Sequence, residues 1–380
     1  MSARRLRLGG RLDRYVGTLF LNSYATAFFL VVGLFLILDM ASNLDEYLEP
    51  WPDGSRVSTF LIGWYYLLDV PFLFLQVAPF VTLVAGLFTV SKLLKLNEVV
   101  AMLGAGVSSW RLLAPIFLLG AISGVLMFGL REAISTGVAA QRDALKHLLE
   151  EKSTDLVYSN LWVRDLNGSA VRLEEFRPSA TIAAASGATE AAPPRIRGLE
   201  AILRSPTHWS SVEAVSATYL PRGSGMGWKL EGGLHEEVAG SQRTEAVDWL
   251  DGFDFTPDLA VTYWRARENP LELSFGEVRE LARRNPDDVV YQTLSQYHLT
   301  FAMANLVLLL VGVPVLMRSD RRRATEGIAT GAILCVFYFA ADFVLRNLGL
   351  QGNLDPLFAA WLPVLIFGSL GLVLYDSMKS

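Results

Sequence analysis

The sequence predicts a membrane α-helical protein with six transmembrane helices and an all-β domain inserted between the third and fourth. Long apolar segments lie in both terminal parts of the 380-residue chain, and the more polar region 131–290 separates them. Each segment is long enough to cross a hydrocarbon core of about 30 Å. Basic residues cluster in the loops on only one side of these segments, which fixes the orientation. The inserted domain is therefore expected on the opposite side, outside the cytoplasm.

The chain divides into three predicted parts: an N-terminal membrane half at 1–130, the inserted domain at 131–290 and a C-terminal membrane half at 291–380. The first half holds span 1 (16–38), span 2 (71–90) and span 3 (110–130), and the second holds spans 4 (294–317), 5 (327–345) and 6 (357–375). Span 1 follows a basic start and lacks a small-residue cleavage site, so it is expected to be an uncleaved helix.

The stretch 58–90 is too long for one span and too short for two with a turn. Asp69 and Pro71 interrupt it. We therefore expect an interfacial segment at 58–69, rich in Trp64, Tyr65 and Tyr66, and a separate span from residue 71. Aromatic side chains favour the headgroup level of a bilayer.

Charge placement supports six spans with both termini in the cytoplasm. The N-terminus and the loops after spans 2 and 4 are basic, whereas the loop after span 1 is acidic. The basic residues are Arg4, Arg5, Arg7, Arg11, Arg14, Lys92, Lys95, Arg111, Arg318, Arg321, Arg322 and Arg323. Only the six-span arrangement puts all of these clusters on one side.

Residues 155–264 are predicted to be β-structure, a sandwich or an open barrel. Two short runs flank Asn167-Gly168, which suits a two-residue type I′ hairpin turn. Further strands are expected in SVEAVSATYL and GWKLEGGLHEEV, and the Ala- and Pro-rich stretch 177–197 is expected to be a loop. A connecting helix at 274–285 is predicted, with Ser274 as N-cap and Glu277 completing a capping box.

Several kinds of chemistry lack a motif. The chain has no GxxxxGK[ST] for nucleotide phosphates, no GxSxG elbow, and no metal-binding spacing among its four histidines. A single cysteine, Cys335, excludes a disulfide within the chain. Asp342 and Arg346 lie four residues apart in span 5 and are expected to form an ion pair on one helix face. A chain with six spans and no energy-converting motif is expected to take energy from a partner.

The cytoplasmic loop LKLNEVVAMLGAG contains a short apolar helix at about 97–104. Asn97 is a candidate cap, Glu98 lies in the first turn, and glycines 104 and 106 end the helix. Such a helix either lies on the inner membrane surface or docks in a groove of a cytoplasmic partner.

The sequence resembles the LptF/LptG (YjgP/YjgQ) permease family. The resemblance rests on LDRYVG, on APFVTLVAGLFTVSKLLKLNEVVAMLGAGVSSWRLLAP, on YHLTFAMANLVLLLVGVPVL and on LDPLFAAWLPVLIFGSLGLVL. LDRYVG and LWVRDLNG lean toward LptG. Asp39 departs from the family, whose members often carry a basic residue at this end of span 1.

The resemblance implies a periplasmic β-jellyroll, a multi-pass inner-membrane location and a complex that exports lipopolysaccharide. The implied partners are a cytoplasmic LptB-like ATPase dimer, a second LptF/LptG-type permease, a paralogue or a second copy, and an LptC-like bridge protein. This chain would be a transport subunit without catalytic residues, cofactor or metal, and ATP would act on the ATPase subunit. No nucleic acid is expected as a partner.

The resemblance also implies site residues. Those implied for ATPase coupling are Asn97, Glu98, Val99, Met102 and Gly106. Lateral-gate candidates are Val31, Phe35, Gly331 and Tyr338, and headgroup-region candidates are Asp39 and Arg346. The expected function is extraction of lipopolysaccharide from the outer leaflet of the inner membrane and its transfer to the bridge. Two alternatives remain: a permease for another amphipathic envelope lipid, and a membrane-anchored periplasmic scaffold.

Overall fold

The computed structural model describes residues 10–51, 57–135, 137–153, 156–179, 192–204, 209–237, 244–318 and 324–377. The chain forms two compact units. The first comprises 1–42, 70–133 and 292–380, and the second comprises 43–69 and 134–291. Most of the Ala- and Pro-rich stretch and the basic residues 321–323 lie outside the described residues.

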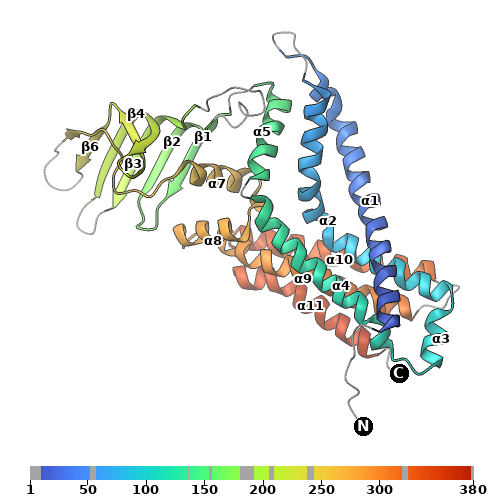
Figure 1. Cartoon of the computed structure of the whole chain (residues 1–380). Helices are drawn as coiled ribbons and strands as arrows, with labels where there is room; N and C mark the ends of the chain where they lie inside the picture. The colour runs from blue at the N-terminus through green and yellow to red at the C-terminus, as the bar shows by residue number, and fades with distance from the viewer. Residues whose placement is uncertain are drawn as a thin grey trace. The chain divides into compact units, whose positions relative to one another are not determined.

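Among the residues that the structure describes, six helices are long and apolar enough to cross a membrane, as the sequence predicts. They are α1 (Arg11–Leu48), α2 (Thr59–Lys95), α4 (Ser109–Ser135), α9 (Val289–Met317), α10 (Ala324–Leu350) and α11 (Pro356–Asp376) (Figure 1). A short helix, α3 (Glu98–Gly104), joins α2 to α4.

The expected break between residues 58–69 and span 2 is wrong. Helix α2 is continuous and contains both Pro71 and Pro79. Proline in a membrane helix is tolerated where neighbouring groups satisfy the freed backbone carbonyls. Tyr65 and Tyr66 are buried against Tyr47 of α1, with ring centroids 5.9 Å and 6.4 Å from it. Packing between the two helices therefore extends α2 beyond its apolar span.

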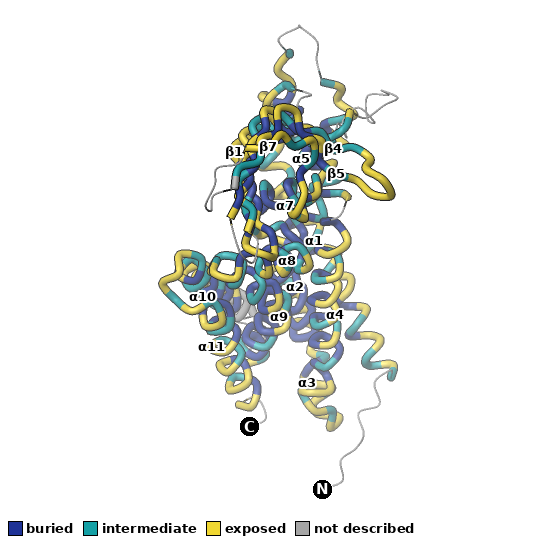
Figure 2. The backbone as a smooth tube through the Cα atoms, turned by 90° about the vertical axis from the view of Figure 1, so that its left-hand side faces the viewer, coloured by how far each residue is buried: buried dark blue, intermediate teal, exposed yellow. Residues whose placement is uncertain are grey.

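The core of the first unit lies where α2, α4 and α9 pack together, whereas α1 is largely exposed. Two-thirds (67%) of the most apolar stretch of α2 and of α9 is buried, against 17% of that of α1 (Figure 2). Small residues permit this packing. A Cβ atom at Gly124 of α4 would lie 2.6 Å from the backbone carbonyl oxygen of Ala302 in α9, so the two helices could not keep this approach with a larger residue. Large apolar side chains of α1 and α10, such as Phe29 and Phe337, are exposed.

The second unit contains one antiparallel sheet. Its strands are β1 (Tyr158–Arg164), β2 (Ala170–Arg177), β3 (Arg195–Arg204), β4 (Trp209–Arg222), β5 (Gly225–Glu231), β6 (Leu234–Glu237) and β7 (Thr244–Ala246). The order is β1-β2-β3-β4-β6-β7, with β5 also pairing with β4 (Figure 1). Strands β5 and β6 pair with successive parts of β4, so they act as one strand interrupted at residues 232–233. The inserted all-β region is confirmed.

The hairpin between β1 and β2 is confirmed, but its predicted turn type is wrong. Gly168 has a φ of +89°, whereas Asn167 is not among the described residues with positive φ. The Asp165 N–H donates to the Ser169 carbonyl, and the Gly168 N–H donates to the Asp165 carbonyl. The loop therefore has three residues, 166–168, instead of the two of a type I′ hairpin, and only Gly168 needs the left-handed conformation.

Within the described ranges, three helices that the sequence pattern did not predict lie beside the sheet. They are α5 (Val138–Glu151), α7 (Pro257–Glu268) and the 3-10 helix η1 (Pro270–Glu272). Trp264 of α7 stacks on Tyr158 of β1 with centroids 4.3 Å apart. Strand β3 was missed because part of it lies in the stretch expected to be a loop. Helix α8 (Phe275–Arg284) was predicted, and its Ser274–Glu277 capping box is present.

Candidate functional site

Helix α3 is a short, well-terminated helix. Asn97 occupies the expected N-cap position, in the left-handed conformation (φ 60°), but its side chain makes no capping hydrogen bond. At the other end, Gly106 has a φ of +79°. The N–H groups of Gly106 and Val107 donate to the carbonyls of Leu103 and Met102. This is the Schellman pattern, which needs a left-handed residue and so favours glycine.

The apolar residues of the α3 segment face two ways. Val99 is 3% exposed and belongs to the core of the first unit, and Met102 packs against the same core. Leu96, Val100 and Leu103 are exposed, Val100 most of all at 68%. Val99 and Met102 therefore anchor the helix to its own chain. The exposed apolar surface belongs to residues that the sequence reasoning did not select.

Glu98 contacts the first transmembrane helix. The Tyr15 hydroxyl lies 3.0 Å and 2.9 Å from the two carboxylate oxygens of Glu98. In the described part of the chain, Tyr15 is the one side chain that donates a hydrogen bond to this carboxylate. An ionised carboxylate offers about four lone-pair sites and Tyr15 supplies one proton, so Glu98 retains acceptor capacity for a partner.

The four lateral-gate candidates do not share one surface. Val31 and Tyr338 are buried, at 6% and 1% exposed, whereas Phe35 is 47% exposed. Gly331 is buried, and a Cβ atom there would lie 3.2 Å from a methyl carbon of Leu87. Gly331 thus permits close packing of α10 on α2. Of the four, only Phe35 presents a large apolar side chain outward.

The headgroup-region candidates differ in their environment. Asp342 and Arg346 form the expected ion pair, with nitrogen and oxygen 3.1 Å apart. The Arg346 guanidinium also lies over the Tyr297 ring of α9, 4.5 Å from its centroid. Arg346 is therefore held by its own chain on two sides. Asp39 is half-buried in α1.

A polar network inside the membrane helices escaped the sequence reasoning. The Thr82 hydroxyl of α2 lies 2.7 Å from the Asn305 side-chain oxygen of α9, and 3.3 Å from the Ser123 hydroxyl of α4. Ser123 in turn lies 2.8 Å from the Tyr24 hydroxyl of α1. A signal was available, because Asn305 interrupts an apolar run, and polar groups in such segments form hydrogen bonds between helices.

An ion-pair cluster in the second unit joins the helices beside the sheet. Arg142 of α5 is 3% exposed. Its nitrogens lie 2.7 Å from Glu272, 3.2 Å from Asp143 and 3.6 Å from Asp69. Burial raises the pKa of Asp143 above its usual range, against the opposing effect of nearby arginines. The cluster ties the N-terminal part of α2 to α5 and η1.

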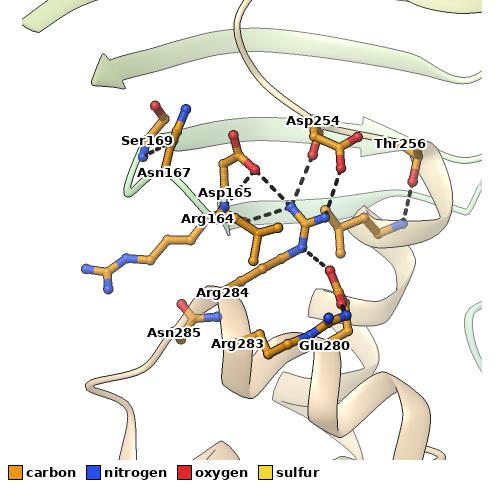
Figure 3. A network of polar contacts seen from close by, with 12 residues as sticks. Arg164, Asp165, Asn167, Ser169, Asp254, Thr256, Glu280, Arg283, Arg284 and Asn285 are labelled. Carbon is orange, nitrogen blue, oxygen red and sulfur yellow. Dashed lines mark hydrogen bonds and ion pairs between the residues drawn. The ribbon is translucent and has the colours of Figure 1, made fainter. Parts of the chain in front are cut away.

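A second cluster is centred on Arg284, the last residue of α8. Its guanidinium lies 2.8 Å from Glu280, 3.2 Å from Asp254 and 3.3 Å from Asp165 (Figure 3). Asp165 belongs to the β1–β2 turn, so the arginine links that turn to the helix. One guanidinium presents its donors in a fixed fork, which suits several carboxylates at once. The Arg284 cluster therefore supports the sheet directly, whereas the Arg142 cluster joins helices beside it.

The described residues contain no group of three or more His, Cys, Asp or Glu side chains that could hold a metal ion. The candidate functional features are the exposed apolar side of α3, the hydrogen bond from α1 to α3, and the sheet with its neighbouring ion-pair clusters. Together they define a multi-pass membrane protein with a short helix between its second and third spans and an antiparallel β-domain inserted after the third.

The family model "Lipopolysaccharide export system permease LptF/LptG" matches residues 14–377, nearly the whole chain. The chain belongs to this family and is a multi-pass inner-membrane permease of the lipopolysaccharide export system. No curated protein matches the sequence.

Proposed function

We propose that this chain is the permease subunit that couples ATP hydrolysis in a separate cytoplasmic ATPase dimer to extraction of lipopolysaccharide from the inner membrane. The observation that carries the proposal is the exposed side of α3. Leu96, Val100 and Leu103 present apolar surface beside the half-buried Glu98 carboxylate. Apolar anchors with an adjacent charge suit a helix that docks in a groove of another protein.

External energy is needed because extraction of a lipid is strongly unfavourable. Each buried CH₂ group contributes about 0.8 kcal/mol to membrane binding, so a lipid with several acyl chains costs tens of kcal/mol to remove. The sequence has no P-loop for ATP. A partner ATPase therefore supplies the energy in this proposal, and α3 receives the motion.

The weakly buried helices α1 and α10 are proposed to face a second permease of the same family. Large side chains such as Phe29, Phe35, Val336 and Phe337 are exposed on them. The cavity between two such permeases would open sideways to the outer leaflet. The extracted lipid would then pass to the sheet domain and to an LptC-like bridge protein.

Orientation is part of the proposal: both termini and α3 in the cytoplasm, and the sheet in the periplasm. The test is labelling of single cysteines by a membrane-impermeant maleimide, with Cys335 replaced. Exposed positions are Ala105 after α3 and Val215 in β4. Labelling of whole cells with a permeable outer membrane is expected at position 215 and not at 105. The reverse pattern would reject the proposed orientation.

The proposed activity is tested in proteoliposomes that contain this chain with its ATPase and partner permease. Wild-type complex should release lipopolysaccharide to soluble bridge protein only with ATP. Release of a different lipid, identified by mass spectrometry of the co-purified lipid, would favour another amphipathic envelope lipid as the substrate. No stimulation of the ATPase and no lipid release would favour a scaffold.

A further inference from the structure

Helix α1 packs on the core of the first unit along one side only, so its polar contacts with other elements also help to position it. Only 17% of its most apolar stretch is buried. Two tyrosine hydroxyls bind it to neighbouring elements of the first unit: Tyr24 to Ser123 of α4, and Tyr15 to Glu98 of α3. The second of these reaches the helix that is proposed to bind the ATPase.

Hydrogen bonds and packing hold the backbone on both sides of the Tyr15–Glu98 contact. On α1, the Gly10 N–H donates to the Asp13 carboxylate at 3.0 Å and the Arg14 N–H donates to the Gly10 carbonyl, so the helix start is closed. On α3, Val99 is buried directly beside Glu98, and a Schellman pattern ends the helix. A displacement of Glu98 would therefore be passed to α1 as a whole rather than lost by local fraying.

The geometry also leaves Glu98 able to bind a second group. Tyr15 is 43% exposed and Glu98 is half-buried, so the pair lies at the surface of the unit. Tyr15 supplies a single proton to a carboxylate with about four lone-pair sites. A cationic side chain of a partner could bind Glu98 while Tyr15 remains bound.

We propose that Tyr15 is a positioning residue: its hydroxyl transmits displacement of α3 to α1 when a cationic group of the cytoplasmic ATPase engages Glu98. This inference rests on the proposed function. It assigns to Tyr15 the link between ATP hydrolysis and motion of the helix that holds the exposed Phe35. The ATPase is held mainly by the exposed Leu96, Val100 and Leu103, so its binding does not require the Tyr15 hydroxyl.

The test compares Tyr15→Phe with Thr18→Val in the reconstituted full complex. Each variant removes one hydroxyl from the same part of α1, but the Thr18 hydroxyl donates to the Arg14 carbonyl of its own helix. The readouts are co-purified ATPase, the rate of ATP hydrolysis, and lipopolysaccharide released per ATP hydrolysed. Tyr15→Phe should lower lipid released per ATP roughly threefold, the scale of one lost hydrogen bond to a partly exposed charge. Thr18→Val should keep the wild-type ratio.

A second comparison uses Glu98→Gln alone and together with Tyr15→Phe. If both residues act through one contact, the double variant should transport no worse per ATP than the worse single variant. Fully additive losses would overturn the inference, as would a wild-type ratio in Tyr15→Phe. A wild-type complex that hydrolyses ATP without releasing lipid would instead overturn the proposed function, and this inference with it.

Discussion

The Thr82 hydroxyl of α2 lies 2.7 Å from the side-chain oxygen of Asn305 in α9, and neither residue is exposed. This hydrogen bond joins two of the most buried helices of the first unit. In an apolar surrounding an unpartnered amide is unfavourable, so the pair favours one particular packing of the helices.

Loss of this bond should destabilise the membrane helices. Thr82→Val is expected to lower the free energy of unfolding by about 0.6–1.7 kcal/mol, which spans the average and the largest values measured for hydrogen bonds between membrane helices. The measurement is unfolding in mixed detergent micelles, followed by tryptophan fluorescence. Thr89→Val is the matched control, because Thr89 is equally buried but donates to the Ala85 carbonyl of its own helix. An equal effect of both substitutions would show that the interhelical bond contributes nothing.

Close packing at Gly331 gives a second prediction. Gly331→Ile should lower stability by about 1–3 kcal/mol, because the new side chain overlaps Leu87. Leu87→Ala alone should also destabilise the protein, but the double variant should lose less stability than the sum of the two single losses, because the shorter side chain makes room. Gly129→Ile is the control, since a Cβ atom there meets nothing within 4 Å. If Leu87→Ala gives no relief, the overlap is not the cause. The same unfolding assay serves.

The two sides of α3 should respond differently to a charge. Val100→Asp is expected to leave the permease folded and to weaken ATPase binding at least about tenfold, as loss of an interface anchor does. Val99→Asp should instead reduce the yield of folded protein, because Val99 is 3% exposed. Val215→Asp in β4 is the control, with an equally exposed valine far from α3 in sequence. Binding is measured by titrating labelled ATPase onto detergent-purified permease. Unchanged affinity in Val100→Asp would reject this docking surface.

The Arg284 cluster predicts a pH dependence. Partial burial raises the pKa of Glu280, but hydrogen bonds from Arg284 and Arg283 outweigh it and hold the pKa below its ordinary value of 4.5. A lowered folded-state pKa gives a stabilisation that is complete above the ordinary pKa and is lost as pH falls through the lowered value. The sheet should therefore weaken as pH falls below about 4.5.

Hydrogen exchange of the β1 and β2 amides measures this effect. Arg284→Met should increase exchange at neutral pH, because Asp165 is buried and loses its charged partner. The same substitution should also reduce the rise in exchange at acid pH that results from protonation of Glu280. Lys146→Ala, which breaks a partly exposed pair with Glu150 on the same helix, is the control and should change little. A wild-type profile in Arg284→Met would contradict the role assigned to the cluster.

The sequence by itself determined the membrane class, the number of spans, the inserted β-region and the family. The membrane class and the number of spans follow from the length of the apolar segments and from the charge of the loops, because a bilayer requires these properties of each segment separately. The Asp342–Arg346 pair and the α8 capping box were also predictable, since both depend on spacing within one helix.

Only the tertiary structure decided which residues meet across helices. Continuity of α2 through Asp69 and Pro71 depends on Tyr47 of another helix and on Arg142, which lies 3.6 Å from Asp69. The core of the first unit decides which side of α3 is buried. It is the reason that Val99 is buried and Val100 is exposed. The Tyr15–Glu98 contact joins residues 83 positions apart. Such contacts leave no periodic signal in the sequence, because they arise from packing of separate segments rather than from local spacing.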